Sequence, residues 1–153
     1  MPIFRPEDEA RVRGLFDTLE RPVELVVAHG PQETPVLGAR EIDFAAETER
    51  VVTELAALSD RVTCRVENEP GAGGSAAGAA SCRFERFPAI AVLPGGRDVG
   101  LRYYGLPWGY ELGSLIGAVV EAGRPESTLR PESLERLGAL DHDLAIDVFV
   151  TPT

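Results

Sequence analysis

The chain contains no lysine, and all 15 of its basic residues are arginine. The absence of lysine excludes Schiff-base catalysis and a phosphate-binding loop of the kind that needs a lysine. Asp and Glu number 25, so the formal net charge is −10, which argues against a nucleic-acid partner because nucleic acids are bound by clustered cations. The same charge repels anionic membrane surfaces, and we expect no membrane partner.

Long apolar runs and a secretory signal are also lacking. No stretch approaches the roughly 18 apolar residues that cross a bilayer. The N-terminal sequence MPIFRPEDEARVRG is acidic and has no apolar core, so we expect a cytoplasmic protein. With 153 residues, 44% of them hydrophobic, the chain is long enough to form a domain with a core of its own.

Cysteine is scarce, with only Cys64 and Cys82, and no CxxC motif occurs. Zinc needs about four nitrogen, sulfur or oxygen ligands, often in close pairs. Because Cys64, Cys82, His29 and His142 are scattered singly, we expect no metal and no other cofactor. Cys64 and Cys82 are candidate redox thiols that would pair across the segment between them. The alternative is two free thiols, one of them buried as a small hydrophobic side chain.

Hydrophobic periodicity predicts alternating helices and strands. The helices are expected at residues 6–19, 43–58 and 110–122 and from Pro131 onward, the second capped by Asp43. The strands are expected at residues 23–28, 61–67, 87–93 and 99–104, the last two forming an antiparallel hairpin. The glycine- and alanine-rich residues 68–81 predict a flexible loop. This order predicts an α/β thioredoxin fold, β-α-β-β-β-α with an extra N-terminal helix.

The end of the chain resembles its beginning. RPEDEARVRGLFDTLERPVELVVAHG starts at Arg5 and RPESLERLGALDHDLAIDVFVTPT at Arg130, and both lead from Arg-Pro-Glu into a strand pattern. Strict apolar alternation predicts that second strand at residues 144–150. We therefore expect residues 1–124 to form one thioredoxin-fold unit lacking CxxC, and residues 125–153 to be the leading helix and strand of a truncated second repeat. Chance similarity of two helix–strand units is the alternative.

The segment FPAIAVLPGGRDVGLRYYGLPWGYELGSLIGAVVEAG, residues 87–123, resembles the first unit of the tandem, glutaredoxin-like protein disulfide oxidoreductases. It is also similar to the related N-terminal domain of the alkyl hydroperoxide reductase flavoprotein subunit. ELAALSDRVT, residues 54–63, and LDHDLAIDVFVTPT, residues 140–153, extend the resemblance to roughly two-thirds of the chain. The resemblance implies that a CxxC motif would follow VFVTPT, beyond Thr153, where a helix N-terminus stabilises the attacking thiolate.

The resemblance also implies where a first-unit site would lie. The position equivalent to the CxxC follows the first strand and reads His29-Gly30-Pro31, a degenerate active-site loop without sulfur. Pro88 matches the cis-proline of thioredoxin folds, so that Phe87 and Pro88 would form a peptide-binding edge. A turn that serves folding alone is the alternative. His29 as a general base would need a reaction partner, and none is evident in the sequence, so a solvated loop histidine is favoured.

Aromatic residues cluster in the segment YYGLPWGYE. Whichever of Tyr103 and Tyr104 faces inward is expected to pack the last helix against the sheet. Trp108 and Tyr110 are interface candidates, because tyrosine and tryptophan are enriched at binding hot spots. Tyr110 replaces the histidine that is common at this position in the family, which weakens any role carried over to it.

These observations predict a redox-silent thioredoxin-fold unit that serves as scaffold and docking surface in a thiol–disulfide oxidoreductase system. The expected partner is another protein or a second thioredoxin-fold unit, and residues 129–153 offer a homodimer contact. Two alternatives stand beside this prediction: an autonomous, non-catalytic protein-binding module, and a small thiol switch built on Cys64 and Cys82. No dithiol catalysis is expected from this chain alone.

Overall fold

The structure, a computed structural model, describes residues 3–30, 43–68 and 82–150. The elements follow one another as α1 (Pro6–Phe16), β1 (Val23–His29), α2 (Phe44–Ala56), β2 (Val62–Asn68), β3 (Ala89–Pro94), β4 (Arg102–Tyr104), α3 (Tyr110–Ala122) and α4 (Pro131–Gly138). The prediction of a flexible loop at residues 68–81 lies outside the described residues, except for Asn68, which ends β2. The predicted role of Pro31 lies outside them as well.

Local signals in the sequence account for most element boundaries. Asp43 caps α2 as predicted, because its Oδ1 accepts a hydrogen bond of 3.0 Å from the Ala46 backbone N–H. A proline stands in the first turn of both α1 and α4, where its missing N–H is not needed. β4 begins later than predicted because Gly100 has φ +82°, which interrupts the extended backbone before the strand.

The four strands form one sheet in the order β2-β1-β3-β4. β1 and β2 are parallel, from Val23↔Val62 to His29↔Asn68, and α2 lies between them in the chain. β3 is antiparallel both to β1 and to β4, as the predicted hairpin requires. This topology confirms the predicted thioredoxin fold.

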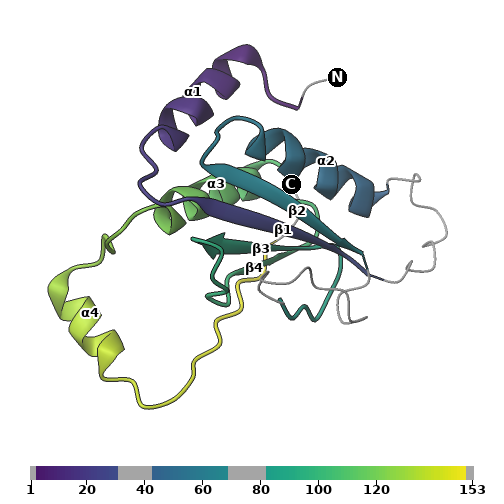
Figure 1. Cartoon of the computed structure of the whole chain (residues 1–153). Coiled ribbons are helices and arrows are strands. Elements are labelled where there is room, and N and C mark those ends of the chain that lie inside the picture. The colour runs from purple at the N-terminus through teal and green to yellow at the C-terminus, as the bar shows by residue number, and fades with distance from the viewer. Residues whose placement is uncertain (1–2, 31–42, 69–81, 151–153) are drawn as a thin grey trace.

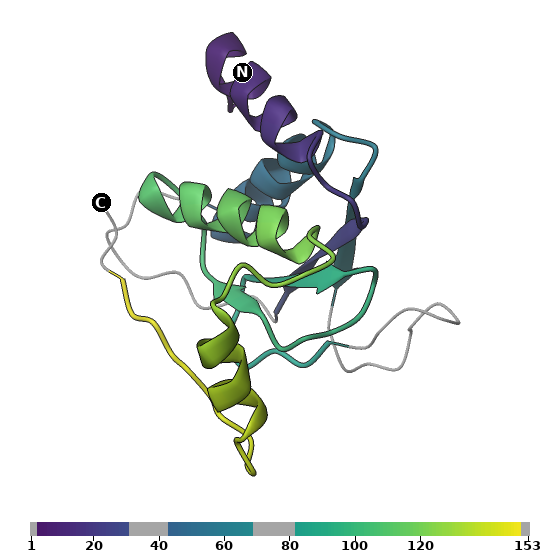
Figure 2. The same cartoon turned by 90° about the vertical axis from the view of Figure 1, so that its left-hand side faces the viewer.

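One face of the sheet carries the main core. Three helices, α1, α2 and α3, cover this face (Figures 1 and 2). Alternating residues of β1 and β3 point into it and meet one apolar stripe from each helix. The fully buried members are Phe16, Val23, Leu25, Val27, Val52, Leu55, Ile90, Val92, Leu115 and Val119.

The opposite face carries a smaller cluster. Val26, Ala91 and Leu93 are buried there with Cys82, which belongs to the segment between β2 and β3. Phe84 of the same segment packs against this cluster. The two faces therefore differ, with helices on one side and an irregular segment on the other.

Arg102 of β4 ties that irregular segment to the sheet. Its guanidinium donates to both carboxylate oxygens of Asp98, at 2.8 and 2.5 Å, and its Nε donates to the Arg83 carbonyl at 3.0 Å. The guanidinium also lies 5.2 Å from the centre of the Phe84 ring. These contacts hold residues 82–84 over the second face.

Two large apolar side chains of the helices lie outside the core. Leu15 of α1 and Phe44 of α2 are exposed. α1 reaches the core only through Val12 and Phe16, so its buried stripe is narrower than the apolar pattern. Phe44 is the first residue of α2.

The strand predicted at residues 144–150 is absent from the structure. Residues 141–150 are exposed and belong to no helix or strand, because no strand within residues 3–30, 43–68 and 82–150 supplies the hydrogen bonds that an isolated strand needs. α4 is present as predicted, but none of its residues is buried. α4 and the segment after it stand apart from the sheet and its helices (Figures 1 and 2).

Candidate functional site

Three segments meet at the carboxyl end of β1. The register Ala28↔Ala89 brings His29 and Gly30 beside the chain that enters β3. The Phe87–Pro88 peptide bond is cis, as the family resemblance implied. β4 ends here too, and the Gly105 backbone N–H donates to the Pro88 carbonyl at 2.8 Å. The structure thus brings the predicted loop residues and the predicted proline edge together.

Gly30 is required by the close packing at this junction. A Cβ built on Gly30 would lie only 2.3 Å from Cδ2 of the Phe87 ring. The ring therefore rests directly on the backbone that follows β1. The aromatic side chain that precedes Pro88 has a structural role here, which the sequence pattern alone did not indicate.

His29 faces α2 instead of solvent. Its Nε2 lies 3.3 Å from Oε2 of Glu49, an ion-pair distance if the ring is protonated, but the two atoms lack hydrogen-bond geometry. The Nε2 atom is buried and has no hydrogen-bond partner, and the same holds for the Oγ1 atom of Thr48 on α2. A general base needs a reacting group within hydrogen-bond reach, and the described residues place none beside His29. The sequence offered no signal for Thr48 or Glu49, since both read as ordinary helix residues.

Cys64 lies on β2, away from this junction. It is paired in register with Leu25, four residues before His29 on β1, which corresponds to roughly 13 Å along the sheet. The two residues therefore do not form a Cys–His pair. Burial is the main cause that raises the pKa of the Cys64 thiol, and the negative charge of Glu49 raises it further. A hydrogen bond with Thr53, whose Oγ1 lies 3.9 Å from the Cys64 Sγ, acts in the opposite direction.

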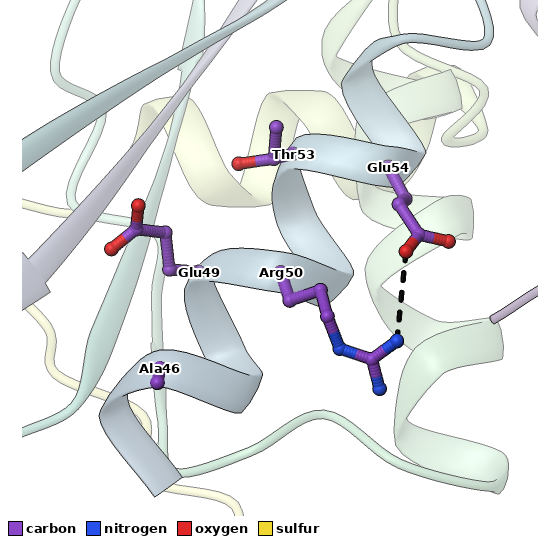
Figure 3. A pocket seen from close by; sticks show the side chains of 5 residues that line it. All are labelled: Ala46, Glu49, Arg50, Thr53 and Glu54. Atoms are coloured by element: carbon purple, nitrogen blue, oxygen red, sulfur yellow. Dashed lines mark ion pairs between the residues drawn. The ribbon is translucent and has the colours of Figure 1, made fainter. Parts of the chain in front are cut away.

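A shallow depression of about 360 Å³ lies on the outer surface of α2, lined by Ala46, Glu49, Arg50, Thr53 and Glu54. Figure 3 shows Glu49 and Thr53 on one flank of the helix and Arg50 and Glu54 on the other. Arg50 is occupied by carboxylates of its own helix, 2.7 Å from Glu47 and 3.6 Å from Glu54. The lining offers two carboxylates and one hydroxyl, but neither a cysteine nor a histidine.

Cys82 lies on the opposite face of the sheet from Cys64. Burial is again the main cause that raises its pKa, and the charge of Asp98 adds to it. The Arg102 hydrogen bonds are the first cause that lowers the pKa of Asp98, and a hydrogen bond with Cys82 contributes to the same effect. Both cysteines are free. A disulfide needs Cα atoms within about 7 Å, whereas the sheet separates the two thiols.

Exposed aromatic side chains surround the carboxyl end of β4. Trp108 and Tyr110 are exposed, and Tyr110 has 85% of its surface accessible. Tyr104 is exposed as well, whereas Tyr103 packs against the main core, where burial raises the pKa of its hydroxyl. Tyr103 is therefore the inward-facing residue of the pair. These three exposed rings, Tyr104, Trp108 and Tyr110, are called the aromatic rim below.

No group of three or more His, Cys, Asp or Glu side chains in residues 3–30, 43–68 and 82–150 is arranged to hold a metal ion. None of the helices in these ranges is long and apolar enough to cross a membrane.

No family model matches this sequence. The alkyl hydroperoxide reductase component AhpF from Xanthomonas campestris pv. phaseoli is 26% identical over 99 residues, which are 65% of this chain and 16% of that protein. AhpF from Escherichia coli K12 is 23% identical over 141 residues, 92% of this chain and 23% of that protein. The chain thus spans less than a quarter of the length of these relatives.

Solved structures show the same fold. The N-terminal domain of AhpF from Enterococcus faecalis V583 matches with a TM-score of 0.70 and 21% identity, over 90% of this chain and 61% of that one. This chain is similar to AhpF in sequence and to its N-terminal domain in fold. A protein disulfide oxidoreductase from Aeropyrum pernix K1 matches the chain with a TM-score of 0.65 and 20% identity, over 89% of this chain and 55% of that one. The resemblance stated from the sequence is therefore confirmed.

Proposed function

We propose that this chain is a redox-silent thioredoxin-fold unit, a scaffold and docking element of a thiol–disulfide oxidoreductase system. The observation that carries the proposal is the placement of its two thiols. Cys64 and Cys82 lie on opposite faces of the sheet, and neither is at the carboxyl end of β1.

Dithiol exchange makes two demands that this arrangement does not meet. The attacking sulfur must be a thiolate, and a second thiol must reach the mixed disulfide to resolve it. Burial raises the pKa of both cysteines, so each is held mainly as the less reactive thiol near neutral pH. The sequence before Cys64 contains no cysteine, so α2 has no thiol at its N-terminus to activate.

The relatives indicate the kind of system in which such a unit would act. They are AhpF, which is part of a peroxide reductase, and a protein disulfide oxidoreductase, and AhpF is several times longer than this chain. A second thioredoxin-fold unit or a separate protein would supply the reactive dithiol. In this arrangement residues 1–124 would be the silent unit.

The aromatic rim favours a second candidate function, an autonomous protein-binding module. Trp108 and Tyr110 are exposed at the sheet end where His29 and Pro88 lie, and such side chains dominate protein interfaces. The two candidates share the absence of chemistry and differ in whether the chain works inside a redox system. Trp108-dependent binding of a disulfide oxidoreductase would favour the first candidate. Trp108-dependent binding of a protein outside any thiol–disulfide system would favour the second.

Insulin reduction tests the redox-silent assignment. The chain, with dithiothreitol as reductant, should precipitate insulin no faster than dithiothreitol alone. The variant with Cys64→Ser and Cys82→Ser is the matched control and should behave identically. Turnover that disappears in the double variant would establish a thiol switch, and turnover that persists in it would show that the site has been wrongly assigned.

A further inference from the structure

The segment 141–150, called the C-terminal arm here, exposes an unusual amount of apolar surface. Ile146 and Val148 are 78% and 80% exposed, and Leu144, Phe149 and Val150 are similarly open. Contiguous exposed apolar residues of this size mark interaction sites or aggregation-prone segments. The apolar residues of the arm alternate as in a strand, and a strand needs a neighbouring strand to complete its hydrogen bonds.

Among the residues that the structure describes, no strand pairs with the outer edge of β4, which can therefore accept one. Val92 N–H donates to the Leu101 carbonyl at 3.3 Å, and Gly105 N–H donates to the Pro88 carbonyl at 2.8 Å, so these groups of the β4 region face β3. In an antiparallel ladder the bonding direction alternates, and the backbone groups of Arg102 and Tyr104 therefore point away from β3. The exposed side chains of Val99, Leu101 and Tyr104 lie along the same edge.

Charge distinguishes this edge from the other free edge, β2. The arm contains three aspartates and no arginine. β2 lies beside α2, because Thr53 of α2 contacts Cys64 of β2, and the negative charge of Glu49 on the same helix acts on Cys64. Arg65 of β2 already pairs with Glu24 and Glu67. Residues 82–104 have four arginines against two acidic residues, a balance of +2 in a chain of net charge −10. An acidic strand is therefore favoured at β4 and disfavoured at β2.

We propose that residues 144–150 of one copy pair with β4 of a second copy, forming a two-fold dimer in which each copy supplies its arm to the other. Within a single chain the arm remains exposed and does not lie on its own sheet. A reciprocal exchange covers two unpaired elements of each copy at once, the arm and the β4 edge. The occupant is a second copy because the acidic arm and the β4 edge that would receive it, with complementary charge, are present on the same chain.

Solution mass provides the first test. Light scattering over a concentration series should show a rise toward twice the 16.4 kDa of one chain. The variant with Ile146→Asp and Val148→Asp should stay monomeric, because both side chains are exposed in the monomer and both lie on the docking strand. Phe44→Asp, at an exposed apolar site on α2, is the matched control and should dimerise as the parent chain does. A parent chain that stays monomeric, or a dimer that survives the double substitution, overturns the proposal.

A disulfide trap locates the contact. In a background of Cys64→Ser and Cys82→Ser, one chain carries Tyr104→Cys and the other Val148→Cys, and the mixture is oxidised. A crosslinked dimer is expected, whereas Val148→Cys mixed with Thr63→Cys, on the β2 edge, should crosslink at least tenfold less. Preferential crosslinking to Thr63→Cys would place the arm on β2 and contradict the proposal. If a single chain that carries both Tyr104→Cys and Val148→Cys forms this disulfide within a monomer, the arm pairs with β4 of its own chain and the proposed dimer is wrong.

Discussion

At the scale of single residues, the junction between β1 and β3 depends on a glycine. Gly30→Ala should destabilise the fold by about 1–3 kcal/mol, because the added Cβ would overlap the Phe87 ring. Urea unfolding followed by far-UV circular dichroism measures this. Gly14→Ala on α1 is the matched control, since nothing lies within 4 Å of its Cβ position, and it should stabilise the helix slightly. Equal midpoints for the two variants would contradict the packing described.

The Asp98–Arg102 pair makes stability depend on pH. The pKa of Asp98 is lowered in the folded state, mainly by the Arg102 hydrogen bonds, so its stabilisation is present above the unfolded pKa of about 4 and is lost as pH falls through the folded value. Asp98→Asn should cost about 1–3 kcal/mol at pH 7 and progressively less below pH 4. Urea midpoints of parent and variant at both pH values test this. A difference that does not shrink in acid would mean that the carboxylate charge is not responsible.

The raised pKa values of the thiols make them slow nucleophiles. In the folded chain at pH 7, Cys64 and Cys82 should each react with iodoacetamide more slowly than a free cysteine, because less thiolate is present and burial limits access. Two thiols per chain should become reactive once the protein is denatured. Mass spectrometry after timed alkylation distinguishes the sites. A folded-state rate above that of free cysteine would reopen the thiol-switch interpretation.

At the scale of elements, α2 depends on its first hydrogen bond. Asp43 Oδ1 accepts from the Ala46 N–H, one of the helix donors that lack a partner within the helix. Asp43→Ala should therefore lower the free energy of unfolding by about 1 kcal/mol. Asp43→Asn keeps an acceptor at the same place and should lose much less, as measured by the same urea transition. If the two variants are equally destabilised, the cap is not the cause.

At the scale of the whole molecule, α4 and the C-terminal arm add little to the core. α4 has no buried residue, whereas the contacts just before it, Arg21 with the Pro125 carbonyl and Thr128 with Glu121, tie residues up to 128 to the body. A chain ending at Thr128 should fold cooperatively and unfold within about 1 kcal/mol of the parent, because surface positions contribute little. Its unfolding midpoint should not vary with protein concentration. A truncated chain without a cooperative transition would show that the thioredoxin-fold unit extends further.

The sequence by itself determined the features that depend on neighbouring residues. Asp43 marks the start of α2, Pro6 and Pro131 start their helices, and Gly95 and Gly96, with φ of +57° and +75°, form the predicted turn between β3 and β4. A helix or a tight turn satisfies its hydrogen bonds within a few residues, so a local pattern is enough to predict it. The order of these elements was then sufficient for the thioredoxin fold, and for recognising that no cysteine stands at the end of β1.

Only the tertiary structure decided the features that depend on residues far apart in the chain. The exposure of Leu15, the contact of Phe87 with Gly30 and the position of Arg102 over Phe84 follow from how elements pack, which periodicity does not contain. The clearest case is residues 144–150, whose alternation is that of a strand and whose backbone forms none. A strand's hydrogen bonds come from another strand, and the described chain supplies no neighbour to this one.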